Sequence, residues 1–205
     1  MRHAFRFPAH IRDSIRRHVH NAVRGLSPQR FRQEPAYVAA LLGRLEGNPY
    51  DGPDGYVIFR STNIDSIGRG AAEHWSGGDF AITADIRRDD LHVAKAILAQ
   101  AKLGTLEDLS PGDGDRLIGQ ISHMRALTRS PKVLFIPELD GTREPMMASG
   151  VQISRGLPNR GIPLPDYFVR RVLTTLDGDT RPGFVNAVQH SSLEQLLVVA
   201  ALRRG

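Results

Sequence analysis

The chain has no cysteine, almost no lysine and no long apolar run, and these absences exclude several classes of protein. Without a cysteine among its 205 residues, it can form no disulfide, thiolate metal site or cysteine nucleophile. No apolar run approaches the roughly 20 residues of a membrane-spanning helix. The charged N-terminus is not followed by the apolar block of a secretory signal. We therefore expect a cytoplasmic protein with no membrane partner.

Positive charge is concentrated at the N-terminus. Residues 1–33 contain eight arginines and one acid, whereas residues 34–205 contain 19 basic and 21 acidic residues. Apolar residues recur at helical spacing from about Pro8 to Arg24, which predicts a basic amphipathic helix in an N-terminal extension, residues 1–33. This helix could hold a nucleic-acid backbone. It could also be a solvated helix with its apolar stripe on the domain, or a transit peptide. The arginines expected to contact nucleic acid are Arg12, Arg16, Arg17 and Arg24.

The stretch from Ala71 to Gly104 carries the candidate chemistry. Asp79 follows two glycines, and two apolar runs separated by a charged turn lead to Gln100-Ala101-Lys102. If both runs are strands they form a hairpin, and side chains two residues apart point the same way. Gln100 and Lys102 then share a face, with Asp79 beside them. A carboxylate, an amide oxygen and an ammonium together suit a divalent metal held against a phosphate.

This pattern resembles the PD-(D/E)XK nuclease superfamily in its Q-x-K form, which Mrr-like and several bacterial defence nucleases have. Asp79 matches the first half of the motif, and Gln100-Ala101-Lys102 matches the second half. Gln100 stands where most members have Glu or Asp, which removes one negative charge. The resemblance implies that Asp79, Gln100 and the Ala101 carbonyl bind Mg²⁺ or Mn²⁺. It also implies that Lys102 orients or helps to deprotonate the attacking water.

Two further acids are candidates for the site. Residues 34–46 predict a helix, with Pro35 suited to its first position and Glu34 in line with its apolar stripe. The resemblance implies that a glutamate on this helix completes the metal site, although Glu34 can equally be a first-turn acid favoured by the helix dipole. Glu73, six residues before Asp79, could bind a second metal or a water, or could be a surface loop acid.

The order of elements decides between strand and helix for residues 92–102. Their composition also suits a helix. The order of the other elements matches the α-β-β-β-α-β core of the family and favours strand. We therefore expect an α/β fold with a central mixed sheet flanked by helices, a core at about residues 34–137 and one domain over residues 34–205. The core elements are a helix at 34–46, strands at 56–60, 79–86 and 92–102, a helix at 115–129 and a strand at 132–136. Outside them we expect loops at 47–55, 156–165 and 177–183, a strand at 147–154, and helices at 166–175 and 191–203.

These features predict a Mg²⁺-dependent phosphodiesterase, a DNA endonuclease of bacterial defence or restriction type. DNA and RNA share the same phosphate chemistry, so DNA is the expected substrate and RNA is the alternative. No separate recognition module is visible, so specificity would come from a homodimer, from a partner protein or from DNA structure. One alternative is a catalytically inactive nuclease-fold protein that binds nucleic acid or scaffolds a partner complex. Another is a wholly helical interaction protein with one helix over residues 92–109.

Overall fold

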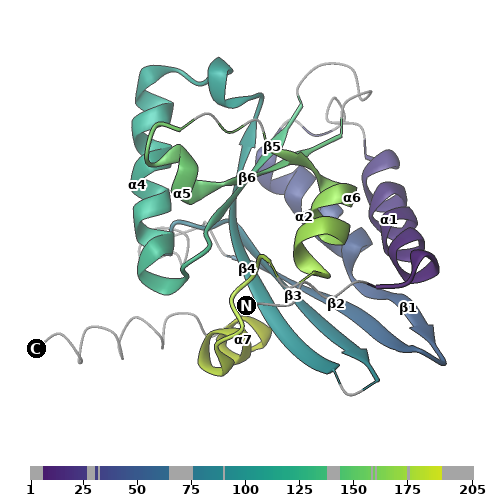
Figure 1. Cartoon of the computed structure of the whole chain (residues 1–205). Coiled ribbons are helices and arrows are strands. Elements are labelled where there is room, and N and C mark those ends of the chain that lie inside the picture. The colour runs from purple at the N-terminus through teal and green to yellow at the C-terminus, as the bar shows by residue number, and fades with distance from the viewer. Residues whose placement is uncertain are drawn as a thin grey trace, which may run out of the picture.

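One open, mostly antiparallel sheet organises the molecule (Figure 1). The computed structural model describes residues 7–26, 31, 33–64, 76–89, 91–137, 144–157, 159, 161–174 and 176–190. Seven strands lie in the sheet in chain order, and each neighbouring pair is antiparallel except β4 and β5, which are parallel. The strands are β1 (Gly47–Gly52), β2 (Gly55–Asn63), β3 (Phe80–Arg88), β4 (Leu91–Leu103), β5 (Lys132–Ile136), β6 (Met146–Ser149) and β7 (Ile162–Pro163).

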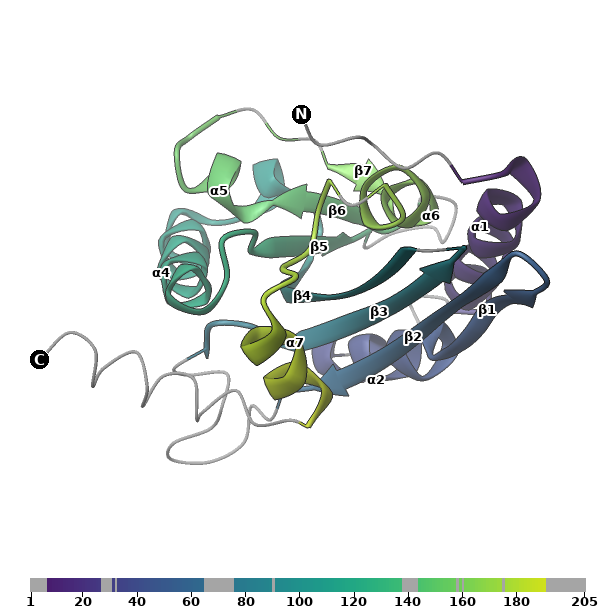
Figure 2. The same ribbon diagram turned by 60° about the horizontal axis from the view of Figure 1, so that its bottom comes forward.

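Helices cover both faces of this sheet and divide the core into two clusters. The first cluster joins one sheet face to α1 (Ala9–Arg24), α2 (Glu34–Leu45), α6 (Leu164–Tyr167) and the π-helical segment η3 (Phe168–Val172). The second joins the other face to α4 (Pro111–Leu127), α5 (Gly150–Ile153) and α7 (Pro182–Gln189). A short 3₁₀ turn, η2 (Leu106–Asp108), links β4 to α4. Figure 2 shows α7 beside the strands and α4 and α5 together at one side.

Residues alternate between the two clusters along the central hairpin, as a strand requires. Ile97 and Ala99 of β4 belong to the first cluster, and Ala96 and Leu98 belong to the second. The predicted strand at 92–102 is therefore confirmed, and the wholly helical alternative is wrong. Apolar contacts on both faces outweigh the helix-favouring composition of this segment.

The basic N-terminal helix is confirmed as α1, and its apolar stripe packs on the rest of the protein. Its inward residues are buried in the first cluster, and they are Ile11, Ile15, Val19, Ala22 and Val23. The helices predicted at 34–46 and 115–129 and the strands predicted at 56–60, 79–86 and 132–136 are also present. Helix α4 begins earlier than expected because Ser110 caps its N-terminus and Pro111 takes its first position, so a stretch that reads as a turn opens the helix.

Four predictions outside the central hairpin are wrong. The loop predicted at 156–165 contains strand β7 and the start of helix α6. Residues 47–52 form the edge strand β1 rather than a loop, because an edge strand tolerates Pro49, whose nitrogen has no hydrogen to donate. The strand predicted at 147–154 ends at Ser149, whose side chain caps α5. Helix α7 begins inside the predicted turn at 177–183, with Pro182 in its first turn. The helix predicted at 191–203 lies outside the described residues.

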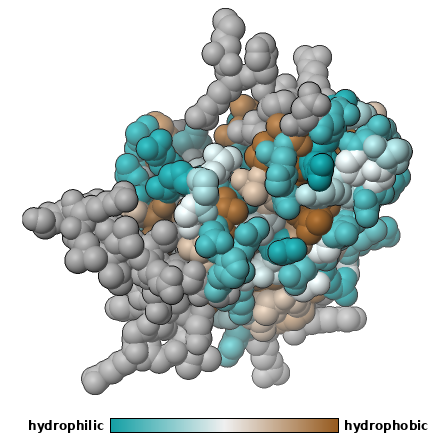
Figure 3. Space-filling view, turned by 90° about the horizontal axis from the view of Figure 1, so that it is seen from below, coloured by the Kyte–Doolittle hydropathy of each residue, from teal (hydrophilic) through white to brown (hydrophobic). Residues whose placement is uncertain are grey.

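The helix predicted at 166–175 is present as α6 and η3, which follow each other without a break. Within the described ranges, none of the helices is both long and apolar enough to cross a membrane. Seen from the end of the sheet where α7 lies, apolar side chains form separate patches among hydrophilic ones (Figure 3).

Candidate active site

Asp79 is held between two neighbouring strands, directly before β3. Its backbone N–H donates to the Ala99 carbonyl of β4 at 2.9 Å, and its carbonyl accepts from the Ile64 N–H at 2.9 Å. The antiparallel register pairs Phe80 with Ala99, so its continuation sets Asp79 opposite Gln100. The candidate carboxylate therefore stands on fixed backbone rather than on a loop tip.

Three polar groups converge on one point beside this carboxylate. The Gln100 Nε2 donates to Asp79 Oδ2 at 2.5 Å and to the Ala101 carbonyl at 3.2 Å. The Ala101 N–H also donates to Asp79 Oδ2, at 2.7 Å. Gln100 is 1% exposed, and its buried Oε1 has no hydrogen-bond partner among the described residues. A buried acceptor with no partner costs about 1–3 kcal/mol, so a ligand that reached this oxygen would gain a favourable contact.

Glu34 and Lys102 form a second pair at the end of β4. Glu34 is the first residue of α2, and its Oε2 accepts from the Leu103 N–H at 3.0 Å. Its Oε1 lies 3.9 Å from the Lys102 Nζ, and both side chains are mostly buried. The start of α2 is thereby attached to the strand that carries the Gln-Ala-Lys sequence. The Glu34 carboxylate therefore reaches the sheet, in agreement with its predicted place in line with the apolar stripe of the helix.

Two glycines allow helix α4 and strand β4 to approach Asp79 closely. A Cβ on Gly77, whose φ is +71°, would collide with the backbone of Gln120 in α4. A Cβ on Gly78 would lie 2.7 Å from a Leu98 methyl carbon. The sequence shows both glycines directly before Asp79, but the element that requires them is distant in the chain. The sequence analysis did not predict that these glycines allow close packing, and the Gly-Gly-Asp run was the only feature of the sequence that could have indicated it.

Five of the predicted site residues lie on β4 or contact it, and the four predicted arginines lie elsewhere. Asp79 contacts Gln100 and Ala101, and Glu34 lies beside Lys102 and Leu103 at the end of the same strand. Glu73 lies outside the described residues. The predicted nucleic-acid-binding arginines lie on α1, which Figure 1 shows at the opposite side of the molecule from α4.

Those arginines are not all equally available for a ligand. Arg16 is partly buried and pairs with Asp13 at 3.3 Å and with Asp166 of α6 at 3.2 Å, so its charge is compensated. Arg12, Arg17 and Arg24 are exposed. The outward face of α1 therefore keeps a basic surface while its inward face packs on the domain.

The oxygen atoms of Asp79, Gln100 and the Ala101 carbonyl are ligands of the kind that a hard cation prefers. Within the described part of the chain, no three His, Cys, Asp or Glu side chains come close enough together to hold a metal. The Asp79 site differs from such a cluster because its other oxygens come from an amide and a backbone carbonyl. Mg²⁺ accepts oxygen ligands of all three kinds and keeps several waters. The residues present therefore fit a Mg²⁺ or Mn²⁺ ion, with the unpaired Gln100 Oε1 as the supporting observation.

Comparisons of the chain with protein-family models, with curated proteins and with solved structures find no match. Function is therefore inferred from the chemistry of this chain's own residues.

Proposed function

We propose that the protein is a metal-dependent phosphodiesterase of the PD-(D/E)XK type, and that its substrate is nucleic acid, DNA in preference to RNA. The observation that carries the proposal is the meeting of the Asp79 carboxylate, the Gln100 amide and the Ala101 carbonyl within hydrogen-bonding distance. Lys102 follows on the same strand, with Glu34 beside it. The series from α2 to β5 gives further support, because apart from the additional edge strand β1 it follows the α-β-β-β-α-β order with a parallel last strand.

Asp79, Gln100 and the Ala101 carbonyl would hold the ion, which would polarise the phosphate and lower the pKa of a bound water. Lys102, two residues after Gln100 on β4, would bring a positive charge to this site, where it would orient the attacking water and compensate charge on the phosphate. The Lys102 Nζ is 3.9 Å from Glu34 Oε1, so this ammonium is not held in a short ion pair. Glu34 keeps the lysine close, and its bond to the Leu103 N–H holds the strand end in place.

The proposal extends to the biological setting suggested by the family resemblance. A role in bacterial defence or restriction would place the enzyme in the cytoplasm. A homodimer or a partner protein would then supply the choice of cleavage site. The exposed arginines of α1, Arg12, Arg17 and Arg24, would add affinity that depends on salt and not on sequence.

The test is cleavage of supercoiled DNA, linear DNA, single strands and RNA with Mg²⁺ or Mn²⁺. Wild type is compared with Asp79→Ala and Lys102→Ala, and Asp115→Ala on the exposed side of α4 controls for loss of a carboxylate. We expect each site variant to lose about 100-fold or more of the rate, and the control to keep it. Cleavage that survives both site changes would refute this site assignment.

One observation favours a second function, that of an inactive nuclease-fold protein that binds nucleic acid or scaffolds a partner. The Gln100 Nε2 already satisfies Asp79 Oδ2 and the Ala101 carbonyl, so these oxygens have partners without a cation. Calorimetric titration with Mn²⁺ separates the two functions. The enzyme requires binding that Asp79→Ala removes, whereas an inactive binder retains nucleic-acid affinity and shows no such metal binding.

A further inference from the structure

The two outer edges of the sheet are protected against pairing with another strand. In β1, Pro49 has no N–H to donate, and its carbonyl accepts from the Ser14 hydroxyl of α1 at 2.6 Å. The opposite edge, β7, is only two residues long and ends with Pro163. Proline, short length and cover by a helix are common means of preventing edge-to-edge association.

The first half of β4 is an inner edge that lacks this protection. Strand β5 pairs only with residues 99–103 of β4, so the preceding residues have a sheet neighbour on the β3 side alone. Ala96 exchanges two backbone hydrogen bonds with Asp179, at 2.9 and 2.8 Å, on the side away from β3. Backbone groups alternate in direction along an antiparallel strand. The N–H and C=O groups of His92 and Ala94 therefore also point away from β3, and no described residue pairs with them there.

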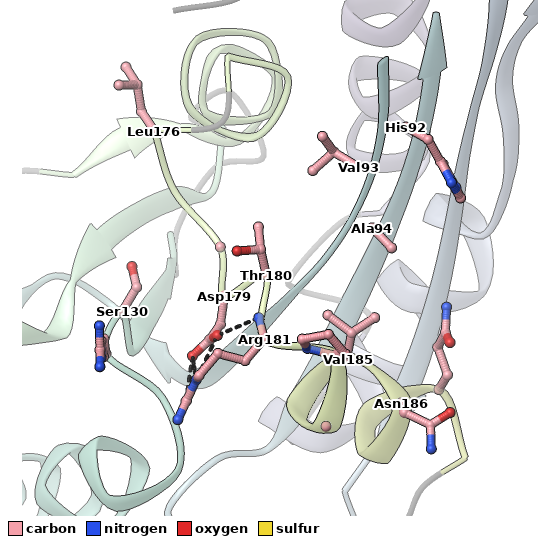
Figure 4. Close-up of a pocket in the computed structure, with 15 residues that line it drawn as sticks. His92, Val93, Ala94, Ser130, Leu176, Asp179, Thr180, Arg181, Val185 and Asn186 are labelled. Atoms are coloured by element: carbon pink, nitrogen blue, oxygen red, sulfur yellow. Dashed lines mark hydrogen bonds and ion pairs between the residues drawn. The ribbon is translucent and has the colours of Figure 1, made fainter. Parts of the chain in front are cut away.

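A groove of about 1270 Å³ runs along these unpaired groups. The consecutive residues His92, Val93 and Ala94 form one wall, and the segment from Leu176 to Arg181 forms the other (Figure 4). Side chains alternate between the two faces of a strand, so a groove over one face would be lined only by every second residue. Because three consecutive residues line this groove, it follows the edge of the strand. The Ala96–Asp179 pair closes one end and shows that this edge accepts an antiparallel segment.

The walls of the groove are partly apolar and carry an excess of positive charge. Val93 and Val185 contribute apolar surface, and Leu176 is a large apolar residue that is 51% exposed. The lining carboxylate, Asp179, is already bound by the Arg181 guanidinium at 2.6 Å. Arg129 is an exposed lining residue that forms no ion pair with the part of the chain described here.

We propose that this groove binds an extended, acidic segment of a partner protein, which adds to the sheet as a strand beside β4. The backbone of the segment would pair with His92 and Ala94, which is the general mode of strand addition at an exposed edge. Its apolar side chains would contact Val93 and Leu176, and its carboxylates would face Arg129. A second copy of the chain fits less well for two reasons. Two-fold pairing of β4 would bring the positive charges of the two grooves together. The groove also has a wall on each side, which leaves the width of a single strand.

Peptide selection tests this proposal without requiring nuclease activity. A display library of random seven-residue peptides is selected on the purified full chain, and enriched peptides are synthesised for titration. We expect peptides rich in Asp and Glu, with alternating apolar residues and no central proline. Amide hydrogen exchange measured by NMR should show that these peptides protect the His92 and Ala94 amides. Protection of those amides that rises with protein concentration in the absence of peptide would instead assign the edge to a second copy and overturn the proposal.

Three variants make the test specific. Ala94→Pro removes an N–H that β3 does not use, and we expect at least a tenfold loss of peptide affinity. Ala94→Ser keeps that N–H and should bind as wild type does. Arg129→Glu leaves the backbone unchanged and should weaken acidic peptides to a similar extent. Failure to enrich any peptide, or affinity unchanged by both Ala94→Pro and Arg129→Glu, would refute the proposal.

Discussion

The amide nitrogen of Gln100 lies 2.5 Å from Asp79 Oδ2, and the amide oxygen of the same side chain has no hydrogen-bond partner in the part of the chain that the structure describes. The same nitrogen donates to the Ala101 carbonyl at 3.2 Å, so each of its two hydrogens is directed at one of these oxygens. A partial positive charge thus stands where a cation would meet the same oxygens. Turning the amide over would present Oε1 to that cation, because the nitrogen and oxygen of a glutamine amide have nearly the same shape.

This relationship predicts the effect of Gln100→Glu. The substitution removes the donor to Asp79 and sets two carboxylates against each other, which is unfavourable unless a proton or a cation lies between them. We expect the variant to unfold at a lower temperature than wild type at neutral pH without metal. Mg²⁺ should raise its unfolding temperature more than that of wild type, because the added charge strengthens cation binding.

Gln152→Glu is the control for this prediction, because Gln152 is exposed on α5. It should show neither the destabilisation nor the gain from Mg²⁺. Equal responses of the two variants to Mg²⁺ in thermal unfolding would mean that the Asp79–Gln100 pair is not a cation site.

Glu34 is predicted to hold the end of β4 by its side-chain acceptor. Glu34→Ala would leave the half-buried Leu103 N–H without its 3.0 Å partner, at a cost of about 1 kcal/mol. Glu34→Gln keeps an acceptor oxygen and should cost less. Urea unfolding of both variants measures the difference. If Glu34→Gln proved as destabilising as Glu34→Ala, the charge of Glu34 rather than this hydrogen bond would be what stabilises the strand end.

Gly77 is predicted to be essential for the packing of α4 beside Asp79. Gly77→Ala places a methyl group against the Gln120 backbone at a φ of +71°, and we expect a loss of about 2 kcal/mol or more. Gly119 lies within α4, and a Cβ added there has open space around it. Gly119→Ala should therefore stabilise the protein by about 0.5–1 kcal/mol. Chemical unfolding of the pair should therefore give free-energy changes of opposite sign. A neutral Gly77→Ala would show that α4 and Asp79 are not packed this closely.

Lys95 is predicted to make the stability of the protein rise with pH. Its Nζ is fully buried and donates to the Val172 carbonyl at 2.7 Å and to the Asp177 carbonyl at 3.0 Å. Burial lowers the pKa of Lys95 from 10.5 to about 8, although the Asp177 carboxylate opposes this shift. Between these two values the unfolded chain binds a proton that the folded chain has released. The free energy of unfolding should therefore rise with pH across this window, by about 3 kcal/mol.

Lys95→Met tests the origin of that rise, because it removes the titrating amine. Urea unfolding of wild type and variant at several pH values across the window gives the difference directly and cancels the contribution of other groups. The wild-type free energy should climb relative to that of the variant as pH increases from about 8. Parallel curves would show that Lys95 titrates with the same pKa in the folded and unfolded chain.

The central hairpin was predictable because local sequence and long-range packing agree there. Alternation puts Gln100 and Lys102 on one face of a strand, and the chain order puts Asp79 at the neighbouring strand end. Strand β1 and helix α7 were not predictable, because glycine and proline are typical of loops and only their neighbours in space give these segments regular structure. The role of Gly77 was hidden for the same reason, since the backbone that it contacts lies more than 40 residues away.

Paramagnetic broadening of backbone amide signals in NMR spectra tests the proposed metal site most directly, because it locates a bound Mn²⁺ ion. Substoichiometric Mn²⁺ should broaden the amides of Asp79, Ala101 and Leu103 first, excess Mg²⁺ should restore them, and Asp79→Ala should abolish the effect. Broadening centred on another part of the chain, or broadening that persists in Asp79→Ala, would contradict the claim that these residues form a metal-dependent phosphodiesterase site.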